Sequence, residues 1–137
     1  MGKKTIKPIE TSEIKLNRLQ AYAKEKPIFS FEYLDTHFLH NSKASDGFYK
    51  DFILRLQKLG ELGWNKIRTS GRHEYGREPI PVSKIKPKMP SVVTPEITHL
   101  DVFRANGAHN VFAGFMRDDV FFVVFIEGKF GELYNHS

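Results

Sequence analysis

The stretch His99–Ile126, with the sequence HLDVFRANGAHNVFAGFMRDDVFFVVFI, decides the fold of this chain. Leu100, Val102 and Arg104 alternate with residues of the other face at its start, as in a strand that buries one side. Asn106-Gly107 is a hairpin signal between this segment and the next. Residues 120–126 are apolar on both faces, which is typical of a strand inside a sheet. The stretch therefore predicts a three-stranded antiparallel meander with a tight turn at Asn106-Gly107 and residues 120–126 as its central strand.

Residues 28–34 predict one further strand, because Phe29, Phe31 and Tyr33 fall on the same face of an extended segment. We expect this strand to pair beside the central strand of the meander. Apolar residues recur at helical spacing between residues 49 and 59, and Gly60 is expected to end that helix in the left-handed conformation. A second short helix is expected over residues 61–68.

Residues 1–26 are expected to form a basic N-terminal lead-in and a short helix, which Pro27 ends. Residues 27–137 are expected to form a single small α+β domain. In this domain the meander and the N-terminal strand make an antiparallel sheet, which packs against two or three helices. Residues 71–95 form a proline-rich basic linker, in which residues 79–86 alternate as an edge strand would.

The composition excludes several classes of protein. With 40% hydrophobic residues and 12 Phe among its 137 residues, the chain can bury a sizeable core and is not a disordered protein. The absence of cysteine excludes a disulfide scaffold, a thiol nucleophile and zinc sites that need thiolates. No apolar stretch approaches the roughly 20 residues that span a bilayer. We therefore expect no membrane partner and a cytoplasmic location.

The net charge of +5 is concentrated in parts of the chain. Residues 65–90 hold seven Lys/Arg and two Asp/Glu, whereas residues 91–137 hold three and six. A concentrated basic segment is typical of a surface that binds a polyanion, and equally of a solvated loop. Lys84, Lys86 and Lys88 alternate within this segment, so an extended chain would present three ammonium groups on one side. Such a row either follows a phosphate backbone or protects a strand edge against aggregation.

The order of these elements resembles the RelE/ParE-like toxin superfamily, small ribonucleases or gyrase poisons of toxin–antitoxin systems. The resemblance rests on Arg104 in the first meander strand, the short hairpin, the apolar central strand, and Tyr134 and His136 near the C-terminus. It implies a metal-independent endoribonuclease without a cofactor, which cleaves mRNA in association with the ribosome and is neutralised by an antitoxin protein. It also implies that Arg104 faces the scissile phosphate, with Tyr134 and His136 beside it.

Cleaving RNA without a metal requires a base for the 2′-OH, an acid for the leaving oxygen, and cations that stabilise the phosphorane. His73, His109 and His136 stand near basic residues and can carry protons. Arginine suits the cationic role, because its planar fork binds phosphate oxygens bidentately. The predicted catalytic residues are Arg104, Tyr134, His136, His73 and Arg77. The predicted nucleic-acid-binding residues are Arg72, Lys84, Lys86, Lys88 and Arg117.

Each of these assignments has an alternative. Residues 72–77 also fit a salt-bridged surface turn, Arg104 a solvent-facing strand residue, and residues 134–136 a frayed terminus. His37 and His40 stand three apart and could form a metal pair, but no third ligand is evident nearby, so we expect no metal site. The whole chain could instead be a non-catalytic nucleic-acid- or protein-binding module on the same fold, or a topoisomerase poison. Of these functions, only cleavage requires an acid, a base and a phosphate clamp together.

Overall fold

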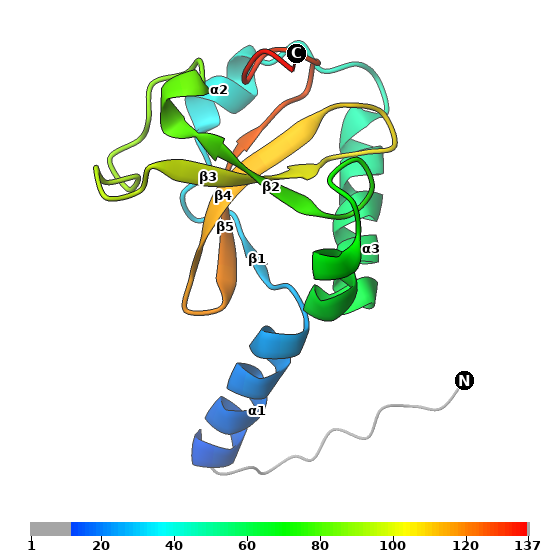
Figure 1. Ribbon diagram of the computed structural model, residues 1–137, viewed down its shortest axis with the longest axis vertical. Helices are drawn as coiled ribbons and strands as arrows, with labels where there is room; N and C mark the ends of the chain where they lie inside the picture. Colours follow the sequence, from blue (N-terminus) through cyan, green and yellow to red (C-terminus); the bar gives the residue numbers. More distant parts are fainter. Residues whose placement is uncertain (1–11, 137) are drawn as a thin grey trace.

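A five-stranded sheet in the order β1-β5-β4-β3-β2 organises residues 12–136, the part of the chain that the computed structural model describes (Figure 1). The strands are β1 (Phe29–Ser30), β2 (Arg77–Pro81), β3 (His99–Arg104), β4 (Val111–Arg117) and β5 (Val120–Ile126). The helices are α1 (Ser12–Glu25), α2 (Thr36–Asn41) and α3 (Phe48–Thr69), and a 3₁₀ turn, η1, spans Val82–Lys84. Strand β1 runs parallel to β5, and the other neighbouring strands are antiparallel. The predicted α+β class is confirmed.

The predicted meander is present as β3, β4 and β5, each antiparallel to the next. Its second turn is the tighter one, since Asp118 and Asp119 have φ values of 53° and 64°, as in a two-residue hairpin loop. At the first turn the Ala105 N–H donates to the Asn110 carbonyl over 2.9 Å, so Asn106-Gly107 lies in a longer loop than predicted. Strand β5 has a neighbour on each side, but β4 is the middle strand of the sheet.

The sheet is buried on both faces. Phe103, Phe112 and Phe121 are buried on the face that α3 covers. Leu100 and Val102 lie on the opposite face, under α2, residues 82–97 and the tail that follows β5. Burying one phenylalanine contributes about 1.5–3 kcal/mol, so three of them are comparable with the whole net stability of a domain, about 5–15 kcal/mol. The sheet is therefore a rigid base for side chains that project from its ends.

Helix α3 differs from the sequence prediction at its two glycines. Gly60 does not end the helix but lies within it, with open space where a Cβ would be. The residue with a positive φ is Gly63, with φ of 80° and ψ of 165°, at a kink inside α3. A Cβ at Gly63 would lie 3.0 Å from the Glu25 carbonyl oxygen. The prediction was wrong because the break depends on the close approach of α1, which a local pattern does not contain.

The N-terminal strand is shorter than the predicted segment 28–34. Strand β1 pairs with β5 through Phe29 and Ser30, the position expected for it, but it runs parallel to β5 and not antiparallel as predicted. The chain then turns, since the Leu34 N–H donates to the Phe31 carbonyl over 3.1 Å, and Phe31 is 42% exposed. Helix α1 matches the helix predicted before Pro27 and extends away from the sheet (Figure 1). Residues 1–11 of the predicted lead-in lie outside the described residues.

The basic linker contains a shorter edge strand than predicted. Strand β2 ends at Pro81 and η1 follows, so the chain is not extended through Lys84. A 3₁₀ turn has three residues per turn, which breaks the period-two alternation of the lysines. Lys86 Nζ donates to the Gly131 carbonyl over 2.7 Å, whereas Lys84 and Lys88 line two different clefts. The three ammonium groups therefore do not form the single row that an extended chain would give.

None of the helices in residues 12–136 is long and apolar enough to span a membrane.

Candidate active site

Arg104 lies at the centre of the candidate site. It ends β3, and by the period of two its side chain leaves the sheet on the face of Leu100 and Val102, away from α3. Its Nη2 is 2.7 Å from His73 Nδ1, and its Nη1 is 3.1 Å from His109 Nδ1. A guanidinium carries five N–H donors. Most of the donors of Arg104 therefore remain for a ligand.

Arginine side chains approach both imidazoles. Arginine only donates, so a ring nitrogen that bonds to it must carry a lone pair. Arg72 Nε donates to His73 Nε2 over 3.2 Å, and Arg104 Nη2 lies 2.7 Å from His73 Nδ1. Since a neutral imidazole has one acceptor nitrogen, His73 accepts from one of these two arginines at a time. An imidazole nitrogen with a free lone pair is the group that a general base needs.

Arg55 of α3 holds the two loops that carry these histidines. Its Nη1 donates to the Glu74 carbonyl over 2.9 Å, and its Nη2 donates to the Asn106 carbonyl over 2.8 Å. Glu74 directly follows His73, and Asn106 precedes His109 in the loop between β3 and β4. A single guanidinium that does not line the cleft therefore sets the separation of the two loops.

The chain after β5 is anchored on a buried carboxylate, Glu127, which is 0% exposed. Its Oε2 accepts hydrogen bonds from Gly131 N at 3.2 Å, Leu133 N at 3.0 Å and His136 Nε2 at 2.9 Å. Its Oε1 has no hydrogen-bond partner among the residues that the structure describes. A buried charge is unfavourable unless it is paired and hydrogen-bonded. The tail therefore folds around one oxygen atom, and His136 is tied to the domain.

The ring of His136 lies against two aromatic rings. Its centroid is 4.1 Å from that of Tyr134 and 4.3 Å from that of Phe130, and its side chain is 8% exposed. Because Nε2 bonds to Glu127, Nδ1 is the nitrogen left for a ligand. Burial above all, with the charges of Glu78 and Glu127 in the same direction, raises the pKa of Tyr134 to about 12. Tyr134 therefore keeps its proton near neutral pH and is a hydrogen-bond donor.

One cleft of about 470 Å³ is lined by the three histidines, Arg104, Tyr134 and Phe130. It is built from the turn before β2, from η1, from the end of β3, from the loop between β3 and β4, and from the tail. The predicted site residues that it brings together are Arg72, His73, Lys84, Arg104, Tyr134 and His136. Glu78 also lines it and pairs with Arg72, Nη1 to Oε1, at 2.7 Å. Cations outnumber carboxylates in this lining, so the cleft favours an anionic ligand.

Comparison of the chain with protein-family models, with curated proteins and with solved structures found no match. What the cleft can do therefore follows from its own side chains. A guanidinium can hold an anion, a neutral imidazole can take a proton, and an imidazole paired with a carboxylate can give one. Together these groups suit proton transfer around a phosphate ester.

The other predicted site residues do not line this cleft. Arg77 pairs with Phe103 across the sheet and so faces α3, where its Nη1 lies 3.5 Å from Asp101 Oδ2. Its guanidinium carbon is 5.4 Å from the ring centre of Trp64. Arg117 ends β4 beside the β4–β5 turn, at the opposite end of the meander from Arg104. Lys86 and Lys88 lie outside the cleft, as described above.

Several residues that line the cleft or support its lining are absent from the predicted set. The sequence offered His109 as a proton carrier, but its contact with Arg104 depends on how the β3–β4 loop closes. Glu127 could have been found as the charged residue directly after a strand that is apolar on both faces. No local pattern in the sequence marked Phe130 as a site residue, because its position in the cleft depends on the fold of the segment after β5. Glu78 and Asn135 also line the cleft.

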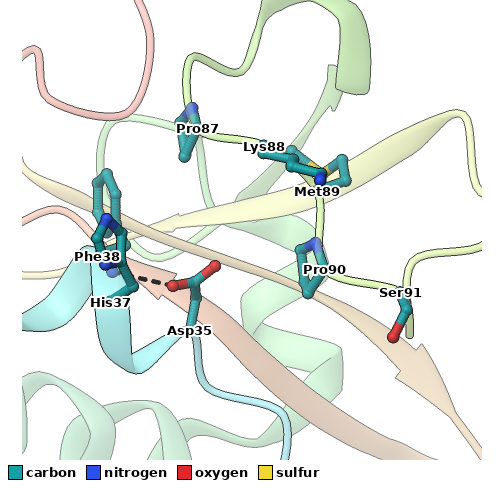
Figure 2. A pocket seen from close by; sticks show the side chains of 8 residues that line it. All are labelled: Asp35, His37, Phe38, Pro87, Lys88, Met89, Pro90 and Ser91. Atoms are coloured by element: carbon teal, nitrogen blue, oxygen red, sulfur yellow. Dashed lines mark hydrogen bonds between the residues drawn. The ribbon is translucent and has the colours of Figure 1, made fainter.

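A second cleft, of about 560 Å³, lies between α2 and residues 87–91 (Figure 2). Figure 2 shows Phe38 and His37 on the helix side of this cleft, and Pro87 and Pro90 on the opposite segment, residues 87–91. The Asp35 carboxylate in this cleft has a structural role, because its Oδ1 accepts a hydrogen bond from the Phe38 N–H at 2.9 Å and so caps α2. The lining contains Lys88 but no arginine. Nowhere in residues 12–136 do three His, Cys, Asp or Glu side chains gather in a way that could hold a metal ion.

Proposed function

We propose that this chain is a metal-independent RNA endoribonuclease. The observation that supports this most directly is the convergence of three groups on one cationic cleft: Arg104, the two imidazoles that contact it, and the His136–Glu127 pair. The resemblance to RelE/ParE-like toxins extends the proposal to a biological role. In that role the chain is a cytoplasmic toxin that cleaves mRNA at the ribosome, and an antitoxin protein neutralises it.

Phosphate binding prepares the base in this mechanism. Oxygens of the scissile phosphate take N–H groups of Arg104 through short, charge-assisted hydrogen bonds. Where a phosphate oxygen takes the N–H group that faces His73 or His109, that imidazole loses its donor, which frees its Nδ1 lone pair. Substrate binding and base activation are therefore the same event, because one guanidinium serves both.

The chemical step needs one proton acceptor and one proton donor. A freed Nδ1, of His73 or His109, takes the proton of the 2′-OH, and O2′ attacks phosphorus. As the bond from phosphorus to O5′ breaks, protonated His136 gives its Nδ1 proton to O5′. Glu127 stabilises the imidazolium form of His136 before transfer, and the Tyr134 hydroxyl donates to a phosphorane oxygen. The products are a 2′,3′-cyclic phosphate and a 5′-OH end, and the next cycle requires His136 to regain its proton.

Cleavage of free and ribosome-bound RNA by the purified chain tests the proposal. We expect cyclic-phosphate ends, no cleavage where the scissile nucleotide is 2′-deoxy, and unchanged cleavage of free RNA in a chelator. Arg104→Ala and His136→Ala should each lower the rate at least about 100-fold. The matched control is Arg68→Ala, since Arg68 is exposed on α3 and bonds to Asn65. Equal rates for Arg104→Ala and the control would overturn the proposed role of Arg104.

Expression of the chain in cells tests the biological setting. We expect growth arrest with cleaved transcripts, relieved by Arg104→Ala or His136→Ala and by co-expression of an antitoxin. Intact transcripts in arrested cells would contradict the ribonuclease and favour a topoisomerase poison. Harmless expression of the wild-type chain without any RNA cleavage would leave a non-catalytic binding module.

A further inference from the structure

Phe130 is a large apolar residue that the fold leaves on the surface. It is 51% exposed, although it belongs to a tail whose neighbours Leu133 and Tyr134 are buried. One side of its ring meets the site, with centroids 4.3 Å from His136 and 5.8 Å from His109. An aromatic ring that is half in contact and half open offers a face to a second planar group.

A further cleft, of about 310 Å³, adjoins the candidate active site at this ring. Its lining residues are Lys43, Ser45, Asn110, Gly128, Lys129 and Phe130. Phe130 lines both clefts, so it forms the ridge between them. A chain-like ligand that leaves the active site over this ridge would enter the Lys43–Lys129 cleft directly.

One carboxylate sets the positions of the two lysines in the Lys43–Lys129 cleft. Glu132 Oε2 accepts from the Lys43 N–H at 2.7 Å, and Oε1 accepts from the Lys129 N–H at 2.7 Å. Ser42 Oγ donates to the same Oε1 at 2.7 Å. Glu132 thus joins two segments that are far apart in the sequence, while Lys43 and Lys129 remain exposed. Gly128 allows this closeness, because a Cβ there would overlap Ser42 and Ala44.

We propose that Phe130 and the Lys43–Lys129 pair form a subsite for the nucleotide next to the scissile phosphate of a single-stranded RNA. The unpaired base stacks on the open face of Phe130, and the following phosphates lie near the two ammonium groups. This subsite rests on the proposed function for its substrate, and it adds the path that the strand takes. A single strand fits because a base must be unpaired to expose its face to a protein ring.

Binding of RNA oligonucleotides that carry a 2′-deoxy nucleotide at the scissile position tests the subsite without cleavage. Phe130→Leu keeps an apolar contact for His136 but removes the flat ring. We expect it to weaken binding of a long oligonucleotide roughly 5- to 150-fold, the range found when one stacked base loses its aromatic partner. An oligonucleotide too short to pass the ridge should lose nothing. Phe31→Leu is the matched control, because Phe31 is 42% exposed and lines neither cleft.

The salt dependence of binding tests the two lysines. Lys43→Ala with Lys129→Ala should reduce the slope of log K against log salt by about 1.4, since each phosphate contact of a single strand contributes about 0.7. Lys66→Ala, at an exposed position on α3, should leave the slope unchanged. Unchanged affinity in Phe130→Leu and an unchanged slope in the double variant would overturn the subsite, even if the wild-type chain cleaves RNA. Binding that depends on Phe130, without any cleavage of ordinary RNA, would retain the subsite and overturn the ribonuclease.

Discussion

Replacing Glu127 by glutamine tests the role of the buried carboxylate most directly. In the wild-type protein one oxygen of Glu127 accepts from two backbone N–H groups and from His136. A glutamine oxygen can keep the backbone bonds, but its amide group must then lie where Oε1 has no partner. A buried unsatisfied donor costs about 1–3 kcal/mol, and the weakened charged hydrogen bond costs about 1.5–3 kcal/mol. Because the variant no longer buries a charge, part of this is offset, and we expect a net loss of about 2–4 kcal/mol.

Urea unfolding measures this loss, with the fluorescence of the buried Trp64 as the signal. The midpoint should fall without a change in the slope m, since the surface exposed on unfolding stays the same. The kcat for RNA cleavage should fall at least about 100-fold, because the imidazolium of His136 loses its counter-charge. Glu32→Gln, at an exposed position outside the cleft, should change neither quantity. A wild-type midpoint in Glu127→Gln, or an unchanged kcat, would refute the reasoning.

Further predictions concern packing, positioning and pH. A Cβ at Gly114 would overlap the Phe122 backbone, so Gly114→Ala should lower the free energy of unfolding by about 2–3 kcal/mol. Gly60 lies inside α3 with open space around it, so Gly60→Ala should raise the free energy of unfolding by about 0.5–1 kcal/mol. Urea titrations that give the reverse order of stability would contradict the structure. Arg55→Met should lower kcat for RNA cleavage by about 10- to 100-fold, because the two histidine loops lose their common clamp; an unchanged kcat would contradict that role. The ultraviolet absorbance of ionised tyrosine should show Tyr134 titrating near pH 12, a step that Tyr134→Phe removes. Since unfolding returns its pKa to 10, the contribution of Tyr134 to stability is complete below pH 10 and is lost as the pH rises towards 12.

The fold was largely predictable because its decisive signals are local. The alternation around Val102 and the apolar run at residues 120–126 fix strand faces, since a strand repeats every two residues. The errors lie where a neighbouring element intervenes. The helix break falls at Gly63 and not at Gly60, because α1 packs against it there. The predicted strand 28–34 ends after Ser30, because the chain turns at residues 31–34 before it meets β5 again, where the Asp35 N–H donates to the Val124 carbonyl.

The sequence by itself determined which groups were available for the site: the histidines, the arginines, and a tail that ends in Tyr134 and His136. It also determined the face of Arg104, because the alternation through β3 is a property of the strand. Only the tertiary structure decided that His73 and His109 meet on one guanidinium, and that His136 bonds to a buried Glu127. These contacts join loops that are far apart in the sequence, so no local period encodes them. What selects the contact of His136 is the need of a buried carboxylate for hydrogen-bond partners, and that need arises only once the fold has excluded water from Glu127.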